Sequence, residues 1–223
     1  MIRIAVASVG LMASAAWALD QNFGVTPSVL EWVQSKWGPE ARVRVASWPE
    51  NMQASLQNHS TDEQKLTNAN DFFNQVRWVA DLEHWQKEDY WATPIETLAT
   101  NAGDCEDFSI GKYFTLLHTQ LALDKLRITY VKALEYNQAH MVLAYYPSPD
   151  AEPLILDNIN KTILPASQRE DLLPVYSFNG DGLWLAKARA KKLTSDTQKN
   201  LPQWREVNER MLREMNEAGK PTP

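Results

Sequence analysis

Apolar positions recur at helical spacing in the first half of the chain. One stripe lies between Thr26-Pro27, typical of a helix start, and Gly38-Pro39, typical of a helix end. Another follows a capping-box sequence at residues 60–64. The first stripe consists of Leu30, Val33 and Trp37, and the second of Leu66, Ala69, Phe73, Val76 and Ala80. The spacing predicts two helices, with residues 40–60 irregular between them.

The middle of the chain changes from helical spacing to short apolar runs. Residues 81–103 are polar and aromatic and predict a loop with at most one short turn. A helix is predicted from Cys105 to about Leu121, with Asp104 as its N-cap. Its predicted buried face consists of Phe108, Tyr113, Leu116 and Leu117. The runs after it predict strands over Arg127–Leu134, Ala139–Tyr146, Pro153–Asp157 and Val175–Phe178.

Helical spacing returns near the C-terminus. Residues 184–200 predict a basic helix, and Pro202 ends that pattern. A last amphipathic stripe consists of Trp204, Val207, Met211 and Met215. Helices at both ends and an antiparallel sheet after the helix at Cys105 indicate an α+β fold.

Composition narrows the class of protein. The chain has 223 residues, of which 44% are hydrophobic and 22% charged, enough for one domain with appendages. Its net charge of −6 argues against nucleic-acid binding. Nine tryptophans and seven tyrosines supply core area and can also line a groove. The candidates for such a lining are Trp78, Trp85, Tyr90 and Trp91.

The N-terminus has the pattern of an export signal. Residues 1–18 combine Arg3, a small-residue apolar run and the sequence Ala16-Trp17-Ala18, which fits the cleavage rule. We expect cleavage near Ala18 and a periplasmic location, and no other segment is apolar enough to span a membrane. The predicted divisions are a signal peptide (1–18), a catalytic domain (19–185), a C-terminal helical extension (186–218) and a disordered tail (219–223).

Cys105 is the single cysteine of the chain, so it cannot form an internal disulfide. It follows a Gly-Asp turn and precedes Glu106 and Asp107. A helix N-terminus lowers a thiol pKa, whereas adjacent carboxylates raise it. This conflict indicates a missing positive charge, either an imidazolium or a bound cation. A lone cysteine also often only fills space in a core.

The second and third predicted strands form a hairpin that joins a histidine and an acid. We take the loop between them as symmetric about Ser148 and Pro149. The predicted pairs are Met141 with Leu156, Leu143 with Leu154, Val142 with Ile155, and His140 with Asp157. Directly opposed residues have Cβ atoms about 4.5–5.5 Å apart, which permits an imidazole–carboxylate hydrogen bond.

These residues predict a catalytic triad. Cys105 would be the nucleophile, His140 the base that takes its proton, and Asp157 the acid that orients His140. The backbone N–H of Cys105 is a candidate oxyanion donor, with Trp91 or the 101–103 loop as a second. His140 could instead face solvent, and Asp157 could be a turn residue. The further candidates are His59, His84 and His118, and neither His84 nor His118 comes with a paired acid.

Three carboxylates next to the thiol give a second signal. Asp104, Glu106 and Asp107 would each oppose thiolate formation by roughly a kcal/mol or more. Oxygen ligands clustered in this way suit Ca²⁺. An acidic first turn of a helix, which needs no metal, accounts for the same residues.

Four segments in order resemble the bacterial transglutaminase-like cysteine proteases. They are Asp89 to Pro94, Gly103 to Phe108, Ala139 to Leu143 and Leu156 to Asn158. The block Gly-Asp-Cys-Glu-Asp is the most specific, and the resemblance spans about residues 25–185. It implies a papain-like or transglutaminase-like fold, an endopeptidase with the triad Cys105, His140 and Asp157, and calcium held by Asp104, Glu106 and Asp107.

The resemblance also implies a biological role. It implies a protein substrate, a large surface adhesin cut near its N-terminus at paired alanines, and hence biofilm dispersal. It further implies control by an inner-membrane receptor that senses cyclic di-GMP. Two alternatives use the same fold: a transglutaminase-type acyl transferase, and a non-catalytic calcium-binding scaffold.

Overall fold

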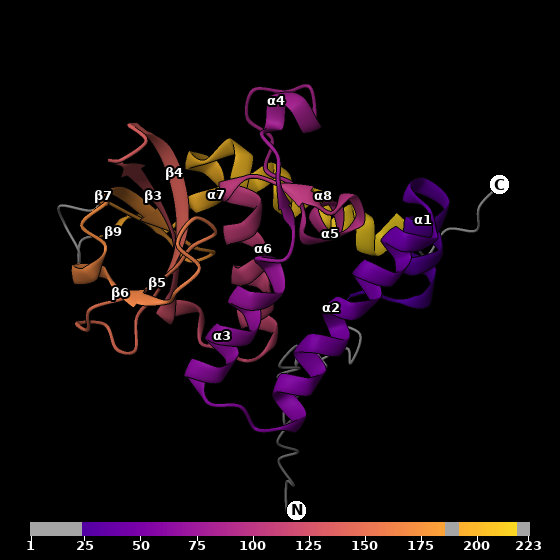
Figure 1. The fold of residues 1–223 in the computed structure, drawn as a ribbon, viewed down its shortest axis with the longest axis horizontal. Coiled ribbons are helices and arrows are strands. Elements are labelled where there is room, and N and C mark those ends of the chain that lie inside the picture. The colour runs from indigo at the N-terminus through magenta and orange to yellow at the C-terminus, as the bar shows by residue number, and fades with distance from the viewer. Residues whose placement is uncertain (1–23, 186–191, 218–223) are drawn as a thin grey trace, which may run out of the picture.

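Helix α6 (Cys105–His118) lies between two hydrophobic cores in the computed structural model, which describes residues 24–185 and 192–217 (Figure 1). One core joins α6 to the sheet, and the other joins it to the N-terminal helices. The predicted signal peptide (1–18) and tail (219–223) lie outside the described residues. The arrangement confirms an α+β fold with helices at both ends.

The N-terminal region is more helical than its sequence predicts. Helix α1 spans Pro27–Trp37, as expected, but residues 40–60 are not irregular: α2 spans Pro39–Gln57. The buried residues of α2 are Ala41, Val45, Trp48, Met52 and Ser55, which fall on one helical face. The interior Pro49 and the many polar residues obscure this stripe in the sequence.

Helix α3 is shorter than predicted. It spans Asp62–Phe73 behind the predicted capping box, and Asn74 caps its C-terminus, so Val76 and Ala80 lie beyond it. Val76 is nevertheless buried, which is why the apolar pattern continues past the helix. A short strand, β1 (Arg77–Trp78), follows and pairs in parallel with β2 (Ala102–Gly103).

The predicted loop over residues 81–103 contains two helices. Helix α4 spans Asp81–His84, and α5 spans Pro94–Thr100. Thr93 and Glu96 form a capping box at the start of α5, a signal present in the sequence. Helix α5 packs into the same core as α1 and α2.

Within the described residues, the sheet has seven antiparallel strands in the order β6-β5-β4-β3-β7-β8-β9. The strands are β3 (Leu126–Ala133), β4 (Gln138–Tyr145), β5 (Leu154–Leu156), β6 (Leu164–Pro165), β7 (Leu172–Phe178), β8 (Leu183–Leu185) and β9 (Lys192–Thr194). Two 3₁₀ turns, η1 (Leu123–Lys125) and η2 (Ala166–Gln168), lie before β3 and β7. The helix predicted over 184–200 is wrong, because β8, β9 and the short α7 (Thr197–Asn200) lie there.

Close packing holds α6 in the centre of the molecule. A Cβ atom at Gly111 would lie 2.1 Å from the Phe73 ring, so glycine permits α3 to approach α6. On its other side, α6 contributes Ile110, Tyr113 and Leu116 to the core that it shares with the sheet.

Helix α8 (Pro202–Glu217) is part of the same core. Trp204 and Val207 are buried beside α6 and the sheet, and the Trp204 ring stacks on Phe114 at 5.7 Å between centroids. Among the described residues, no helix combines the length and apolarity that crossing a membrane requires.

Candidate active site

Cys105 occupies the first position of α6, and Asp104 is the N-cap. The side chain of Asp107 accepts hydrogen bonds from the backbone N–H of Asp104 at 3.3 Å and of Ala92 at 2.7 Å. A Cβ atom at Gly103 would lie 2.7 Å from the Asp107 carboxylate. Glycine at this position therefore allows the Asp107 side chain to hold the turn that presents Cys105.

His140 and Asp157 form a buried hydrogen bond of 2.8 Å between Nε2 and Oδ1. The register that predicted this pair is wrong by two residues, since Leu143, not Met141, lies opposite Leu156. The loop between β4 and β5 is centred one residue later than predicted. A shift of two residues preserves both faces of a strand, so the two side chains still meet, diagonally across the pair.

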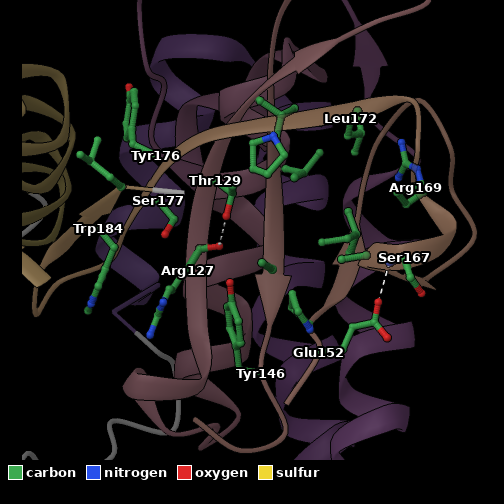
Figure 2. Close-up of a pocket in the computed structure, with 18 residues that line it drawn as sticks. Arg127, Thr129, Tyr146, Glu152, Ser167, Arg169, Leu172, Tyr176, Ser177 and Trp184 are labelled. Atoms are coloured by element: carbon green, nitrogen blue, oxygen red, sulfur yellow. Dashed lines mark hydrogen bonds between the residues drawn. The ribbon is translucent and has the colours of Figure 1, made fainter. Parts of the chain in front are cut away.

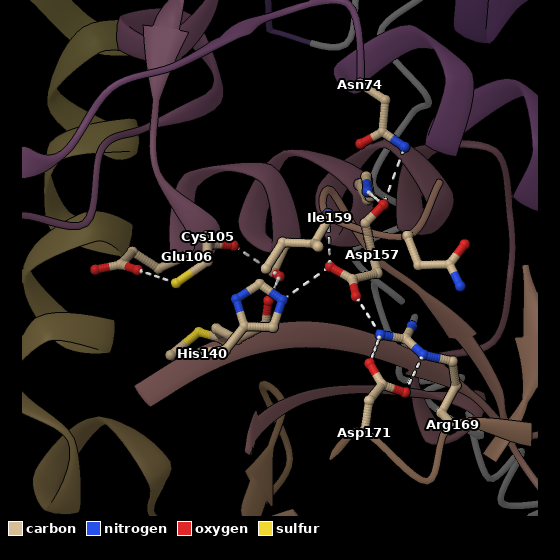
Figure 3. A network of polar contacts seen from close by, with 12 residues as sticks. Asn74, Cys105, Glu106, His140, Asp157, Ile159, Arg169 and Asp171 are labelled. Carbon is tan, nitrogen blue, oxygen red and sulfur yellow. Dashed lines mark hydrogen bonds and ion pairs between the residues drawn. The ribbon is translucent and has the colours of Figure 1, made fainter. Parts of the chain in front are cut away.

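Cys105 and His140 line one groove of about 730 Å³. Figure 3 shows His140 between Cys105 and Asp157, with the ring nitrogen that is not bonded to Asp157 on the side of the sulfur. The Cys105 thiol donates to Glu106 Oε2 at 2.9 Å. Among the described residues that line the groove, His140 is the only histidine, and none of His59, His84 and His118 lies there.

The predicted aromatic residues divide between groove and interior. Trp78 and Trp91 line the groove; Trp78 is 58% exposed, whereas Trp91 is buried against Phe178. Trp85 and Tyr90 contact each other instead, with centroids 4.8 Å apart. The Trp91 indole donates to Asp89 Oδ1 at 2.9 Å, so in this conformation its N–H is already engaged.

Several carboxylates gather beside the Cys105 thiol. In the part of the chain that the structure describes, three sets have ligand atoms within 4.8 Å of one another: Asp104, Cys105 and Glu106; Asp81, Asp104 and Asp107; and Asp81, Asp89 and Glu106. The sequence prediction missed Asp81 and Asp89, which come from the segment predicted as a loop. Asp81 Oδ1 and Asp104 Oδ1 are buried without a hydrogen-bond partner. Several oxygen donors converging with orphaned lone pairs fit a hard divalent cation.

Burial and mutual repulsion control ionisation in this cluster. Burial, followed by the charges of Glu106 and Asp81, raises the pKa of Asp104 to about 9. Burial raises the pKa of Glu106 to about 7, and the charge of Asp107 contributes. The pKa of Cys105 lies well above its usual range because of burial and the Glu106 carboxylate. The thiol therefore stays protonated at neutral pH unless positive charge is added nearby.

Asp157 has the opposite environment. Burial alone would raise its pKa, but hydrogen bonds from His140, Ile159 and Arg169 hold the pKa below its usual range. An ionised carboxylate only accepts hydrogen bonds, so the Nε2 atom of His140 carries the proton. The other ring nitrogen, Nδ1, is the one on the side of Cys105.

Three residues that contact Asp157 were not predicted from the sequence. Arg169 forms an ion pair with Asp157 Oδ2 at 2.6 Å, while Asn74 and Lys112 each donate to its backbone carbonyl at 3.0 Å. Asn74 caps α3 and Lys112 lies on α6, so distant elements converge on one residue. No local pattern marks these residues, although a lysine on the predicted buried helix was a possible signal.

A second hollow, of about 290 Å³, lies on the other face of the sheet (Figure 2). Its walls include Val142, Ala144, Ile155 and Trp184, together with Arg169. Neither Cys105 nor His140 lines it, so it is separate from the groove that holds the thiol.

Comparison with known proteins identifies relatives of this chain. Residues 43–178 match the family model described as bacterial transglutaminase-like cysteine proteinase BTLCP. The fold is similar to that of Legionella pneumophila LapG, with a TM-score of 0.71 and 42% identity over 82% of this chain and 95% of that one. Structures of that protein described as EGTA-treated and calcium-bound give TM-scores of 0.72 and 0.71, again at 42% identity and 82% of this chain, covering 95% and 98% of theirs. A comparison with curated proteins gives no match.

Proposed function

The chain belongs to the bacterial transglutaminase-like cysteine proteinases, and on that premise we propose that Cys105, His140 and Asp157 are the catalytic triad of a calcium-dependent endopeptidase. The observation that carries the proposal is the buried hydrogen bond between His140 and Asp157 beside the single thiol. Membership makes the chain a cysteine protease with a protein substrate. The roles below are our assignments for its residues.

The geometry supports acylation followed by hydrolysis. The Nδ1 atom of His140 takes the thiol proton, and the thiolate attacks the scissile carbonyl carbon. His140 then gives this proton to the leaving amine, which leaves a thioester on Cys105. A water molecule, deprotonated by His140, attacks the thioester and releases the acid and the free thiol. Asp157 keeps the imidazole in one tautomer and one orientation throughout.

The backbone at the start of α6 is suited to bind the oxyanion of each tetrahedral intermediate. The first N–H groups of a helix have no partner within it and carry partial positive charge. The N–H of Cys105 is the donor closest in sequence to the reacting sulfur. We assign it as one donor of the oxyanion hole.

Calcium is the cation that we propose for the acidic cluster. Asp104, Glu106 and Asp107 would hold it, with Asp81 from the start of α4 as a further ligand. When bound, calcium would neutralise the carboxylates that raise the pKa of Cys105 and would fix the turn that presents the thiol. The calcium-bound structure of a LapG protein supports this choice of metal.

Peptide hydrolysis by purified protein tests the chemistry. We expect a quenched fluorescent peptide with an Ala-Ala pair to be cleaved in calcium and not in EGTA, with activity restored by added calcium. Cys105→Ala should abolish cleavage without lowering the melting temperature greatly. Cleavage by Cys105→Ala at the wild-type rate would contradict the triad. Transfer to a labelled amine without hydrolysis would instead indicate an acyl transferase.

The biological role that we propose follows the family resemblance. The leader over residues 1–18 would direct the protein to the periplasm, with cleavage near Ala18. There it would cut the N-terminal region of a large surface adhesin, release it and disperse biofilm. A cyclic-di-GMP-sensing inner-membrane receptor would restrain it. Mass spectrometry of shed surface fragments should show one that is present with wild-type protein and missing with Cys105→Ala; identical fragments would contradict this role.

A further inference from the structure

Arg169 lies directly behind the acid of the proposed triad. Its side chain is 2% exposed, and Nη2 donates to Asp157 Oδ2 at 2.6 Å. The same guanidinium contacts Asp171 through Nη2 at 2.8 Å and through Nε at 2.9 Å. One arginine thus joins the buried Asp157 to a partly exposed carboxylate (Figure 3).

This contact determines how the Asp157 carboxylate is oriented. Oδ1 accepts from His140 at 2.8 Å and from the backbone of Ile159 at 3.0 Å, while Oδ2 accepts from Arg169. Without a donor at Oδ2, the carboxylate could rotate about its Cβ–Cγ bond and lose alignment with the imidazole. A buried carboxylate also needs a paired cation to stay ionised.

Local structure fixes Arg169 itself. It follows η2, its backbone N–H donates to Ala166 at 3.1 Å, and its carbonyl accepts from Leu172 at 3.1 Å. Asp171 accepts hydrogen bonds from two nitrogens of the planar guanidinium, an arrangement that a lysine could not reproduce. The arginine is therefore a rigid support and not a flexible counter-ion.

We propose that Arg169 is a positioning residue for peptide-bond cleavage, which holds Asp157 so that one carboxylate oxygen stays aligned with His140 Nε2. The inference rests on the proposed triad. It predicts that Arg169 acts on turnover only through Asp157. Arg169 does not line the groove that holds Cys105, so substrate binding should not depend on this residue.

Kinetics of three variants test the proposal with the Ala-Ala peptide in calcium. Arg169→Met should lower kcat by about 10- to 100-fold, as does loss of the partner that orients a metal-ligating side chain, and leave KM within about twofold. Arg169→Lys keeps the positive charge but lacks the planar guanidinium, and should recover part of the loss in kcat. The control is Arg205→Met, which removes an arginine from an exposed ion pair on α8 and should match wild type.

A double-mutant cycle separates positioning from general damage to the fold. Asp157→Asn should itself lower kcat strongly. If Arg169 acts through Asp157, adding Arg169→Met to Asp157→Asn should cause less than a twofold further loss. If the fold losses in kcat of the two single variants instead multiply in the double variant, the inference is wrong. Wild-type turnover in Asp157→Asn would overturn the proposed triad instead, so the two failures are distinguishable.

Histidine NMR reports directly on the hydrogen bond between His140 and Asp157. In the ¹⁵N-histidine-labelled protein, the His140 Nε2 proton should be protected from exchange with water by its hydrogen bond to Asp157. Arg169→Met should speed its exchange. If Arg169→Met fails to fold, Asp171→Asn, which loosens the guanidinium from its exposed side, should show the same changes to a smaller extent. An unchanged Nε2 proton together with unchanged kcat in either variant would overturn the inference.

Discussion

Residue Asp157 is contacted from four separate elements: β4, α6 and the ends of α3 and η2. Both its carboxylate oxygens are bonded, and its backbone carbonyl accepts from Asn74 and Lys112. The sequence predicted its contact with His140, because both side chains fall on one face of a strand pair whether the register is right or shifted by two residues. Arg169 was not predictable, since nothing in its surroundings in the chain indicates a partner twelve residues earlier.

Lys112 gives a pH-dependent prediction. Burial lowers the pKa of this 1%-exposed amine to about 7, with the Asp157 charge opposing the shift. Between about pH 7 and the unfolded pKa near 10.4, the unfolded chain binds more protons at this site than the folded chain. The stability that Lys112 contributes should therefore rise with pH in this window, by up to about 1.4 kcal/mol per unit, and be lost as pH falls towards 7.

Urea unfolding of wild type and Lys112→Met from pH 6 to 10 measures this contribution. The difference in free energy of unfolding between them should shift in favour of wild type as pH rises from 7. A difference that stays constant with pH would show that Lys112 is charged in the folded protein throughout. Lys161→Met is the control, because this neighbouring lysine is exposed and not buried.

Helix α2 shows why element prediction failed where it did. Charged and amide residues separate the apolar residues of its buried face, and Pro49 lies inside the helix, so the helical signal in the sequence is weak. Tertiary packing supplies what the sequence pattern lacks: Trp48 is buried, and its indole donates to Thr115 on α6 at 2.8 Å. The strands, whose apolar runs are continuous, were predicted to within one or two residues over β3, β4 and β5.

Two valines on α2 measure this packing. Val45 is fully buried, whereas Val43 is 65% exposed on the same helix. Val45→Ala should lower the free energy of unfolding by about 2 kcal/mol, from lost burial and the cavity left behind. Val43→Ala should change it by less than about 0.5 kcal/mol. Thermal unfolding of both variants measures these changes. Equal losses of stability in the two variants would mean that α2 does not pack as described.

Helix α8 provides the corresponding pair at the other end of the chain. The sequence resemblance stopped near residue 185, yet Trp204 is in the main core. Trp204→Ala should cost about 3–5 kcal/mol, while Leu212→Ala, at a 56%-exposed position, should stay within about 0.5 kcal/mol of wild type. If Trp204→Ala were as stable as wild type, α8 would be an appendage and not a part of the core.

At the scale of the whole molecule, two cores meet on α6 and the acidic cluster gathers at its N-terminus. The predicted cluster was incomplete, because Asp81 and Asp89 reach it only through the path of the chain between β1 and α5. A cation bound there would join α4, the 89–94 segment and α6. Calcium should therefore stabilise the entire fold and not the local turn alone.

Calorimetry in calcium and in EGTA tests this linkage. A ligand held at one hundred times its dissociation constant adds about 2.7 kcal/mol to stability, so the melting temperature should rise by several degrees. Asp104→Asn combined with Glu106→Gln should remove the calcium-dependent part of the rise. A control pair of substitutions at two exposed acids on α8, Glu206 and Glu209, should leave the calcium-dependent rise in melting temperature unchanged. A calcium effect of equal size in both pairs would place the ion elsewhere.

The central claim, that His140 activates Cys105 once the acidic cluster is neutralised, is tested most directly by alkylation of the thiol. Because the chain has one cysteine, the rate of iodoacetamide labelling followed by mass spectrometry reports on Cys105 alone. At neutral pH we expect fast labelling in calcium, slow labelling in EGTA, and slow labelling in both for His140→Ala. Equal rates for the wild type in calcium and in EGTA, or fast labelling of His140→Ala in calcium, would contradict the claim.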